Sequence, residues 1–180
     1  MKRFALLSTA LAVSLTATAA GAQEARPLGE AFMIGLKACI AIEQGQLALN
    51  PPSQAQTDAG LVLADPTAPD ELIAFSDLSP SARLFAAVNA TGGSVVVAHD
   101  PSQSLCRVVV FDAADISPVT AAVGPLGGDW VVKLDDPIPN FTIFTGTILG
   151  SPKFTIRTRQ PPAGSGYGSA NYLLTLLPAS

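Results

Sequence analysis

The only histidine of the chain, His99, is followed directly by Asp100, and Ser102 and Ser104 lie within the next five residues. A hydrolytic triad needs a histidine within hydrogen-bond reach of both a nucleophilic hydroxyl and an acid. Neither serine sits in a recognisable nucleophile motif, and the run His-Asp-Pro-Ser-Gln-Ser is rich in turn formers. We therefore interpret residues 99–104 as a hydrated hairpin turn, and a hydrolase that uses His99 is the alternative hypothesis.

Metal binding is not indicated by the residues available for it. One histidine and two cysteines far apart in the sequence do not make a zinc site of normal composition. Asp129, Asp135 and Asp136 surround a short predicted strand, but their spacing is not that of a calcium-binding EF-hand loop. The sequence therefore predicts no metal site and no cofactor, and we assign the three acids to turns.

A glycine-rich segment at 164–168 raises the question of phosphate binding. A phosphate cradle requires such a loop to open a helix, whose N-terminus faces the anion. Here a predicted strand follows at 172–177, so a flexible connection between strands is the better interpretation. Arg157 and Arg159 share one face of a predicted strand, where they could bind an acidic group, but charge that protects a sheet edge explains them as well. No pair of carboxylates stands out as a glycosidase pair, and we single out no catalytic residue.

The first 22 residues have the layout of a secretory signal peptide. Basic residues at positions 2 and 3 precede an apolar run at 4–19, and Ala-Gly-Ala then leads to a predicted cleavage between Ala22 and Gln23. A membrane anchor is the competing interpretation, but the apolar run is short and contains several Thr and Ser residues. The alanine-rich style of the segment is typical of bacterial signal peptides and favours a bacterial source. We therefore expect a periplasmic or secreted protein.

The remaining chain, residues 23–180, has the size of one domain. Without the two basic residues of the leader, eight basic residues face 14 acidic ones, so the formal charge of the mature chain is −6. An acidic domain with scattered basic residues lacks the electrostatic footprint of a nucleic-acid-binding protein. No later apolar run is long enough to span a bilayer. The partner expected is an envelope protein or a small ligand.

Two cysteines in an exported chain are most simply joined in one disulfide. Cys39 lies in the first predicted helix, and Cys106 opens the second strand of a predicted hairpin. They do not form a Cys-x-x-Cys motif, so a redox-active pair is not indicated. We predict a structural bridge from Cys39 to Cys106, and two buried free thiols are the alternative.

Three helices are expected from apolar spacing and from the positions of proline. The main one covers 30–49, with Met33, Leu36, Ile40 and Leu47 at helical spacing. A second begins at Ser79-Pro80 and ends at Thr91-Gly92-Gly93, although a strand at 83–88 competes with it. A short third helix covers 115–123, with Asp115 as its cap and Pro118 in its first turn. The proline-rich stretch 50–78 is expected to be irregular.

Six strands are expected. The central hairpin pairs the valine-rich runs 94–98 and 107–111, which lack polar alternation and so are expected to be covered on both faces. The others are 130–134, 141–149, 154–159 and 172–177, and alternation in 154–159 places it near an edge. The predicted class is α+β: one long N-terminal helix, with one or two short ones, packed on a mostly antiparallel sheet of about five to six strands.

The functional hypothesis follows from these absences. We expect a small exported protein that acts as a non-catalytic binding or structural partner in the cell envelope. A hydrolase centred on His99 would require that this side chain line a pocket with an acid behind it. A carrier of a small apolar ligand would require a closed apolar cavity between the main helix and the sheet.

Overall fold

The computed structural model describes residues 23–62, 78, 84–124, 131–133, 141–147, 151, 153–161 and 170–178. Along the chain its elements are β1 (Arg26–Pro27), α1 (Leu28–Glu43), α2 (Gln54–Asp58), β2 (Leu84–Val88), β3 (Ala90–Thr91), β4 (Ser94–Asp100), β5 (Leu105–Phe111), α4 (Ser117–Val123), β6 (Val131–Lys133), β7 (Phe141–Thr147), β8 (Lys153–Arg159) and β9 (Ala170–Pro178). The predicted leader 1–22 and its cleavage site, Asp129, Asp135, Asp136 and the segment 164–168 lie outside the described residues, apart from Gln23.

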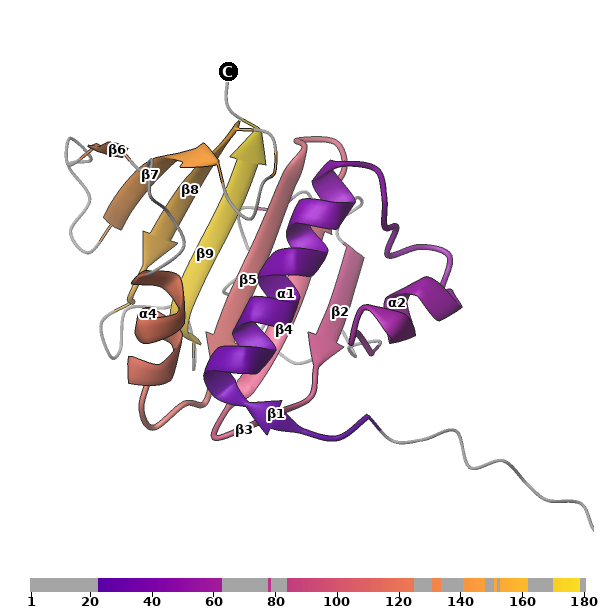
Figure 1. The fold of residues 1–180 in the computed structure, drawn as a ribbon, viewed down its shortest axis with the longest axis horizontal. Coiled ribbons are helices and arrows are strands. Elements are labelled where there is room, and N and C mark those ends of the chain that lie inside the picture. The colour runs from indigo at the N-terminus through magenta and orange to yellow at the C-terminus, as the bar shows by residue number, and fades with distance from the viewer. Residues whose placement is uncertain are drawn as a thin grey trace, which may run out of the picture.

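Seven antiparallel strands form one sheet in the order β2-β4-β5-β9-β8-β7-β6, and α1 runs across one face of it (Figure 1). A short parallel pair, β1 with β3, stands beside it. The predicted α+β class, with helices packed on an antiparallel sheet, is confirmed. The sheet has one strand more than expected because β2 joins it.

The valine-rich hairpin is confirmed as β4 and β5, with Val95 opposite Val110 and Val97 opposite Val108. Side chains of successive strand residues point to opposite faces. Val95 and Val97 accordingly belong to the core cluster under α1, whereas Val96 belongs to a second cluster on the other face. Both faces of the hairpin are therefore covered, as the absence of polar alternation predicted.

The main helix begins two residues earlier than predicted and ends at Glu43, so it has 16 residues. Gly45 adopts a φ of +70°, which a glycine tolerates without strain and which stops the helix. The inward face of α1 packs closely on the sheet, because a Cβ on Gly35 would lie only 3.0 Å from Val108 Cγ1. Met33, expected on the apolar stripe, is only partly buried because it lies on the outer side of α1.

The second predicted helix is wrong over its described part, since Leu84–Val88 is strand β2. It pairs antiparallel with β4, with Ala86 opposite Val97. Five residues with apolar side chains satisfy either a helix face or a buried strand, and pairing with the valine-rich neighbour decides the outcome. The competing interpretation, a strand at 83–88, matches the structure.

The third helix is confirmed as α4, with Pro118 in its first turn. It begins at Ser117, and the prediction of Asp115 as its cap is wrong by one position, because the N-cap residue is Ile116. The Asp115 carboxylate instead accepts hydrogen bonds from the Ser117 N–H (2.9 Å) and hydroxyl (2.6 Å). These bonds hold the pKa of Asp115 below its usual value. Within the stretch expected to be irregular, the structure adds the short helix α2.

The last strands are found near their predicted positions as β6 to β9. In β8, Phe154, Ile156 and Thr158 are buried and Arg157 is exposed, as the alternation predicted. However, β8 lies between β9 and β7 and is not an edge strand. An interior strand with one face exposed to solvent shows the same alternation of apolar and polar residues as an edge strand. The prediction that this strand lies near an edge was wrong for that reason.

Candidate functional site

The disulfide is the first feature of the candidate region. Cys39 Sγ and Cys106 Sγ are 1.98 Å apart, their Cα atoms are 5.5 Å apart, and both residues are fully buried. The bridge ties α1 to β5 in the interior of the domain. The predicted pairing of Cys39 with Cys106 is confirmed, and the alternative of two free thiols is excluded.

His99 lies beside this bridge. It is the residue of β4 that faces Cys106 across the β4–β5 ladder, so it belongs to a strand and not to the turn that was predicted. The hairpin strands extend to Asp100 and from Leu105, which leaves only residues 101–104 for the turn. The turn-forming residues do make the connection between the strands, but the first two of them, at 99 and 100, still pair as part of β4.

An acid stands next to His99, and it is one that the sequence did not single out. Glu43 follows Cys39 by one turn of α1, and its Oε1 lies 3.4 Å from His99 Nε2. The Glu43 side chain is 4% exposed and that of His99 is 15% exposed. Within the described part of the chain, no group donates a hydrogen bond to Glu43 Oε1, and the His99 imidazole is the polar group beside it.

Asp100 takes no part in this pair because alternation along β4 places it on the opposite face of the sheet. It is fully buried and organises the turn: its Oδ1 accepts bonds from the Ser102 N–H (3.0 Å) and hydroxyl (2.6 Å), and Oδ2 accepts one from Gln103 Nε2 (2.8 Å). Ser102 therefore donates its hydroxyl to Asp100. Ser104, with a φ of +46°, completes the exposed turn. His99 has an acid partner but no activated serine beside it among these residues.

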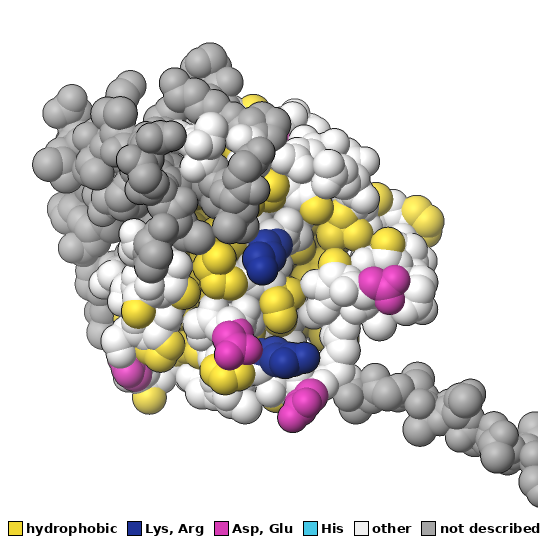
Figure 2. Space-filling model, in the orientation of Figure 1, with side chains coloured by type: hydrophobic (Ala, Val, Ile, Leu, Met, Phe, Trp, Pro, Cys, Tyr) yellow, Lys and Arg dark blue, Asp and Glu magenta, His cyan; other side chains and the backbone are white. Residues whose placement is uncertain are grey.

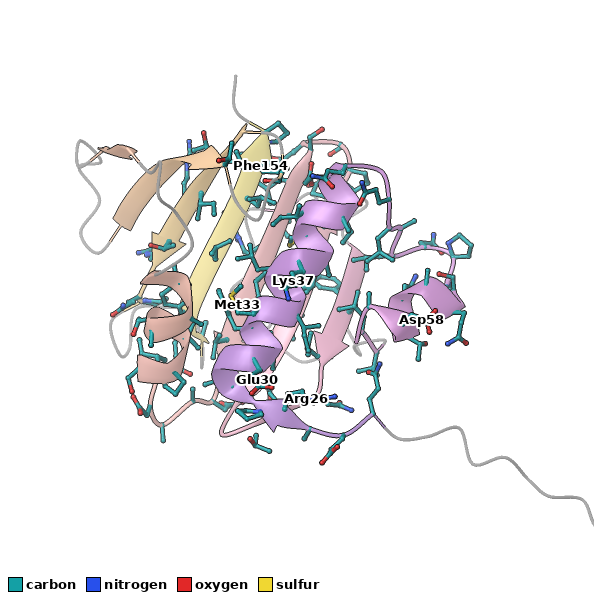
Figure 3. The ribbon with its side chains drawn as sticks, in the orientation of Figure 1. Arg26, Glu30, Met33, Lys37, Asp58 and Phe154 are labelled. Carbon is teal, nitrogen blue, oxygen red and sulfur yellow. A yellow bond between two sulfur atoms is a disulfide. The ribbon has the colours of Figure 1, made fainter. Side chains whose placement is uncertain are left out.

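A groove runs along the outer side of α1, with a volume of about 370 Å³. We call it the α1 groove; its lining residues are Arg26, Gly29, Glu30, Met33, Ile34, Lys37 and Ala122. Glu30, Met33 and Lys37 follow one another along the helix on the face that Figure 3 presents. Figure 2 shows the same face, where a few basic and acidic side chains lie among apolar ones.

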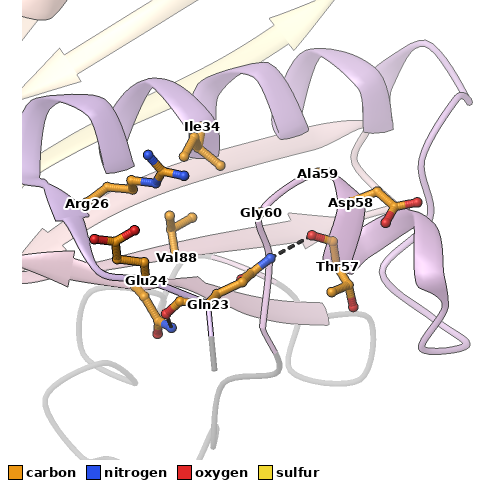
Figure 4. Close-up of a pocket in the computed structure, with 10 residues that line it drawn as sticks. Gln23, Glu24, Arg26, Ile34, Thr57, Asp58, Ala59, Gly60 and Val88 are labelled. Atoms are coloured by element: carbon orange, nitrogen blue, oxygen red, sulfur yellow. Dashed lines mark hydrogen bonds between the residues drawn. The ribbon is translucent and has the colours of Figure 1, made fainter. Parts of the chain in front are cut away.

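A second hollow of about 280 Å³ lies where the N-terminal segment passes α2 and β2 (Figure 4). Gln23 holds this segment in place: its Nε2 donates to the Thr57 carbonyl (2.6 Å), and its own carbonyl accepts from Asn89 Nδ2 (2.8 Å). Its Oε1 is buried without a hydrogen-bond partner. Arg26 and Ile34 line both this hollow and the α1 groove.

The contact between α1 and the central strands is dense. Phe32, Leu36 and Cys39 are fully buried there, and Phe32 meets the ring of Tyr172 edge to face at 5.5 Å. Neither the α1 groove nor the second hollow enters this contact. Among the described residues, this contact is thus closely packed, and the carrier of an apolar ligand stays a prediction.

Within the described ranges, no cluster of three or more His, Cys, Asp or Glu side chains could hold a metal ion. In the same part of the chain, no helix has the length and apolarity needed to cross a membrane. Comparison of the chain with protein-family models, with curated proteins and with solved structures finds no match.

Proposed function

We propose that this chain is an exported, disulfide-bonded binding domain of the cell envelope that docks a protein partner in the α1 groove and catalyses no reaction. Two observations support export. The leader-like segment has the charge and apolar layout of a signal peptide. A buried disulfide also suits an oxidising compartment, where such bridges persist.

The observation that carries the binding role is the composition of the α1 groove. Met33 and Ile34 remain partly accessible on the outer side of a helix whose inner side is already packed on the sheet. Glu30 and Lys37 are exposed on either side of them. An apolar centre with charged groups at its margin is the usual anatomy of a protein–protein contact.

A hydrolase centred on His99 is the second candidate, and the 3.4 Å contact with Glu43 is the observation in its favour. An acid behind an imidazole orients it in many hydrolases. Against this role, His99 lines neither the α1 groove nor the second hollow, and the Ser102 hydroxyl is bonded to Asp100. The pair is better explained as a polar contact that joins α1 to β4.

Site-specific photo-crosslinking in intact cells tests the binding role. A photoreactive residue at position 37, in the groove, is compared with one at position 103, in the exposed hairpin turn. We expect a discrete crosslinked species from position 37 and none from position 103. Equal products from both positions, or none from either, would contradict the proposal.

A panel of ester, amide and phosphate substrates tests the enzyme alternative. The wild type and His99→Ala are assayed side by side, with Gln103→Ala as the control on the same hairpin. We expect no turnover by any of the three proteins. Turnover by the wild type that His99→Ala abolishes and Gln103→Ala retains would overturn the non-catalytic role.

A further inference from the structure

The two charged residues of α1 in the groove, Glu30 and Lys37, are opposite in sign and lie on either side of an apolar centre. Glu30 and Lys37 are seven residues apart, and Met33 and Ile34 lie midway between them. At 1.5 Å of rise per residue, the two charges are separated by about 10 Å along the helix axis, each about 5 Å from the midpoint. Along α1 itself, the surface therefore carries an acid on one side of the apolar centre and a base on the other; Arg26, just before the helix, adds a second base beyond Glu30.

The geometry points to a second copy of this chain as the partner, with two α1 helices packed antiparallel about a two-fold axis between Met33 and Ile34. This inference rests on the proposed binding role and names its partner. A two-fold axis makes residue i of one copy meet residue j of the other and the reverse. Glu30 of each copy then lies opposite Lys37 of its neighbour, while the apolar centres meet.

A parallel arrangement of the same helices is disfavoured by its charges. It would place Glu30 against Glu30 and Lys37 against Lys37, and like charges brought together across an interface are repulsive. Two small residues, Gly29 and Ala122, form part of the groove lining. At Gly29 the chain packs closely on α4, because a Cβ there would lie 2.6 Å from the Pro118 carbonyl oxygen.

The dimer is expected to be weak. A 16-residue helix is about 24 Å long, so one helix pair covers less than the roughly 800 Å² per partner of a stable interface. Charge pairs at the margin of an interface contribute mainly to specificity and orientation. We therefore expect a dissociation constant on the order of 10–100 μM, as for weak, transient contacts.

Charge reversal combined with mixing tests the antiparallel pairing. Sedimentation equilibrium of the purified exported protein is compared for the wild type, Glu30→Lys, Lys37→Glu and an equimolar mixture of these two variants. Each variant alone sets like charges opposite each other, and we expect each to weaken association about tenfold or more. In the mixture, every charged pair is again opposite in sign, so a heterodimer with about wild-type affinity is expected.

Arg157→Glu is the matched control, because it makes the same change of charge as Lys37→Glu at an exposed position of β8. It should leave the wild-type association unchanged. Thermal unfolding of each variant, expected at the wild-type temperature, shows that the exposed substitutions leave the fold intact. Glu30→Gln and Lys37→Gln remove each charge without reversing it and should weaken association by less.

The inference is overturned if the wild type stays monomeric up to about 1 mM, which is ten times the upper end of the expected range. It is also overturned if the mixture associates no better than either variant alone. An equal loss of association in Arg157→Glu would overturn it as well. If the wild type is monomeric while position 37 still crosslinks to a different protein, the self-pairing fails and the binding role stands. If neither is seen, both fail.

Discussion

His99 Nε2 lies 3.4 Å from Glu43 Oε1, and the disulfide explains why these two side chains meet. Glu43 is one turn of α1 beyond Cys39, and His99 is the cross-strand neighbour of Cys106. The bond between the two cysteines fixes the position of α1 along the hairpin, so the next turn of the helix faces β4, the strand beside β5. A covalent contact and a polar contact thus secure the same junction.

The polar contact should contribute to stability. His99→Ala leaves the buried carboxylate of Glu43 without the imidazole beside it, which costs about 1–3 kcal/mol for an unsatisfied group. Glu43→Gln should cost less, because the amide keeps its volume and carries no charge. Urea unfolding measures both.

A double-mutant cycle separates the pair from other effects. We expect the cost of His99→Ala and Glu43→Gln together to fall short of the sum of their separate costs by at least about 0.5 kcal/mol. Glu30→Gln is the control, since it makes the same change at an exposed position of the same helix. Strict additivity would mean that the contact is not an interaction.

The disulfide should be the largest single contribution. It closes a loop between residues 67 apart in sequence, which the loop-entropy relation equates with about 4 kcal/mol. Cys39→Ser with Cys106→Ser should lower the free energy of unfolding by about this amount in guanidinium titrations. Reductant should bring the wild type to the level of the variant and leave the variant unchanged. Reactive thiols in denatured, non-reduced wild type would refute the bridge.

The parts of the fold predicted correctly are those in which local and tertiary preferences agree. Valine runs fit a sheet by their stiffness, and pairing 94–98 with 107–111 satisfies that preference. Leu84–Val88 could satisfy either a helix or a strand, and only the presence of β4 beside it decides. The helix α1 ends at Glu43, shortly before Gly45 with its positive φ, whereas the apolar spacing alone continued to Leu47.

The candidate site was less accessible to prediction because its members meet only through the fold. Nothing near Glu43 in the sequence distinguishes it from an exposed acid at a helix end, and its partner is 56 positions away. The one signal was its spacing of four from Cys39, which places both on one helix face. The α1 groove was likewise hidden, because Met33 fits the expected apolar stripe as well as the buried residues do.

The tight contact at Gly35 should make that position intolerant of a side chain. A Cβ would lie 3.0 Å from Val108 Cγ1 and 3.2 Å from Val97 Cγ2, and both valines are fully buried. Overpacking of this kind costs about 1–3 kcal/mol, against a gain of about 1 kcal/mol from replacing glycine in a helix. We expect Gly35→Ala to lower the free energy of unfolding by about 1 kcal/mol.

Gly124→Ala is the matched control, because nothing lies within 4 Å of a Cβ at that position and its φ is −52°. It should be neutral or slightly stabilising. Adding Val108→Ala to Gly35→Ala should cost less than Val108→Ala does alone in the wild type, since the methyl group then occupies freed space. A Gly35→Ala protein more stable than the wild type would mean that the valines move aside at no cost.

Alkaline stability should depend on Tyr172. Burial raises the pKa of its hydroxyl from 10.0 to about 12, and a hydrogen bond with Thr158 opposes that shift. Between these two values the folded protein holds a proton that the unfolded chain releases, so stability is complete below pH 10 and declines as the pH rises toward 12. The loss amounts to about 2–3 kcal/mol.

Tyr172→Phe isolates this effect from the titration of other groups. The unfolding free energies of the variant and the wild type are measured at several pH values from 8 upward. Above pH 10 the wild type should lose stability relative to the variant. At pH 8 the variant should differ from the wild type by about 1 kcal/mol, the value of one hydrogen bond. A difference that does not change with pH would show that the tyrosine ionises as freely as in the unfolded chain.

The contacts of Gln23 predict the chemical state of the mature N-terminus. On the proposed cleavage after Ala22, Gln23 becomes the first residue, and its free α-amino nitrogen can attack its own Cδ with loss of ammonia to form a cyclic lactam. That reaction requires the side chain to fold back on its own backbone. In the structure the Gln23 Nε2 instead donates a hydrogen bond to the Thr57 carbonyl, and the Gln23 carbonyl accepts one from Asn89 Nδ2. We therefore expect the open glutamine to persist in the folded protein.

Intact-mass spectrometry over days of incubation measures the loss of ammonia from the purified mature protein. Asn89→Ala releases the Gln23 carbonyl and should speed the cyclisation, whereas Asn50→Ala, in an exposed loop, should leave it at the wild-type rate. Because both substitutions remove the same amide, a faster reaction only at position 89 assigns the protection to this contact. Cyclisation of the folded wild type at the rate of the urea-unfolded chain would show that Gln23 is not held.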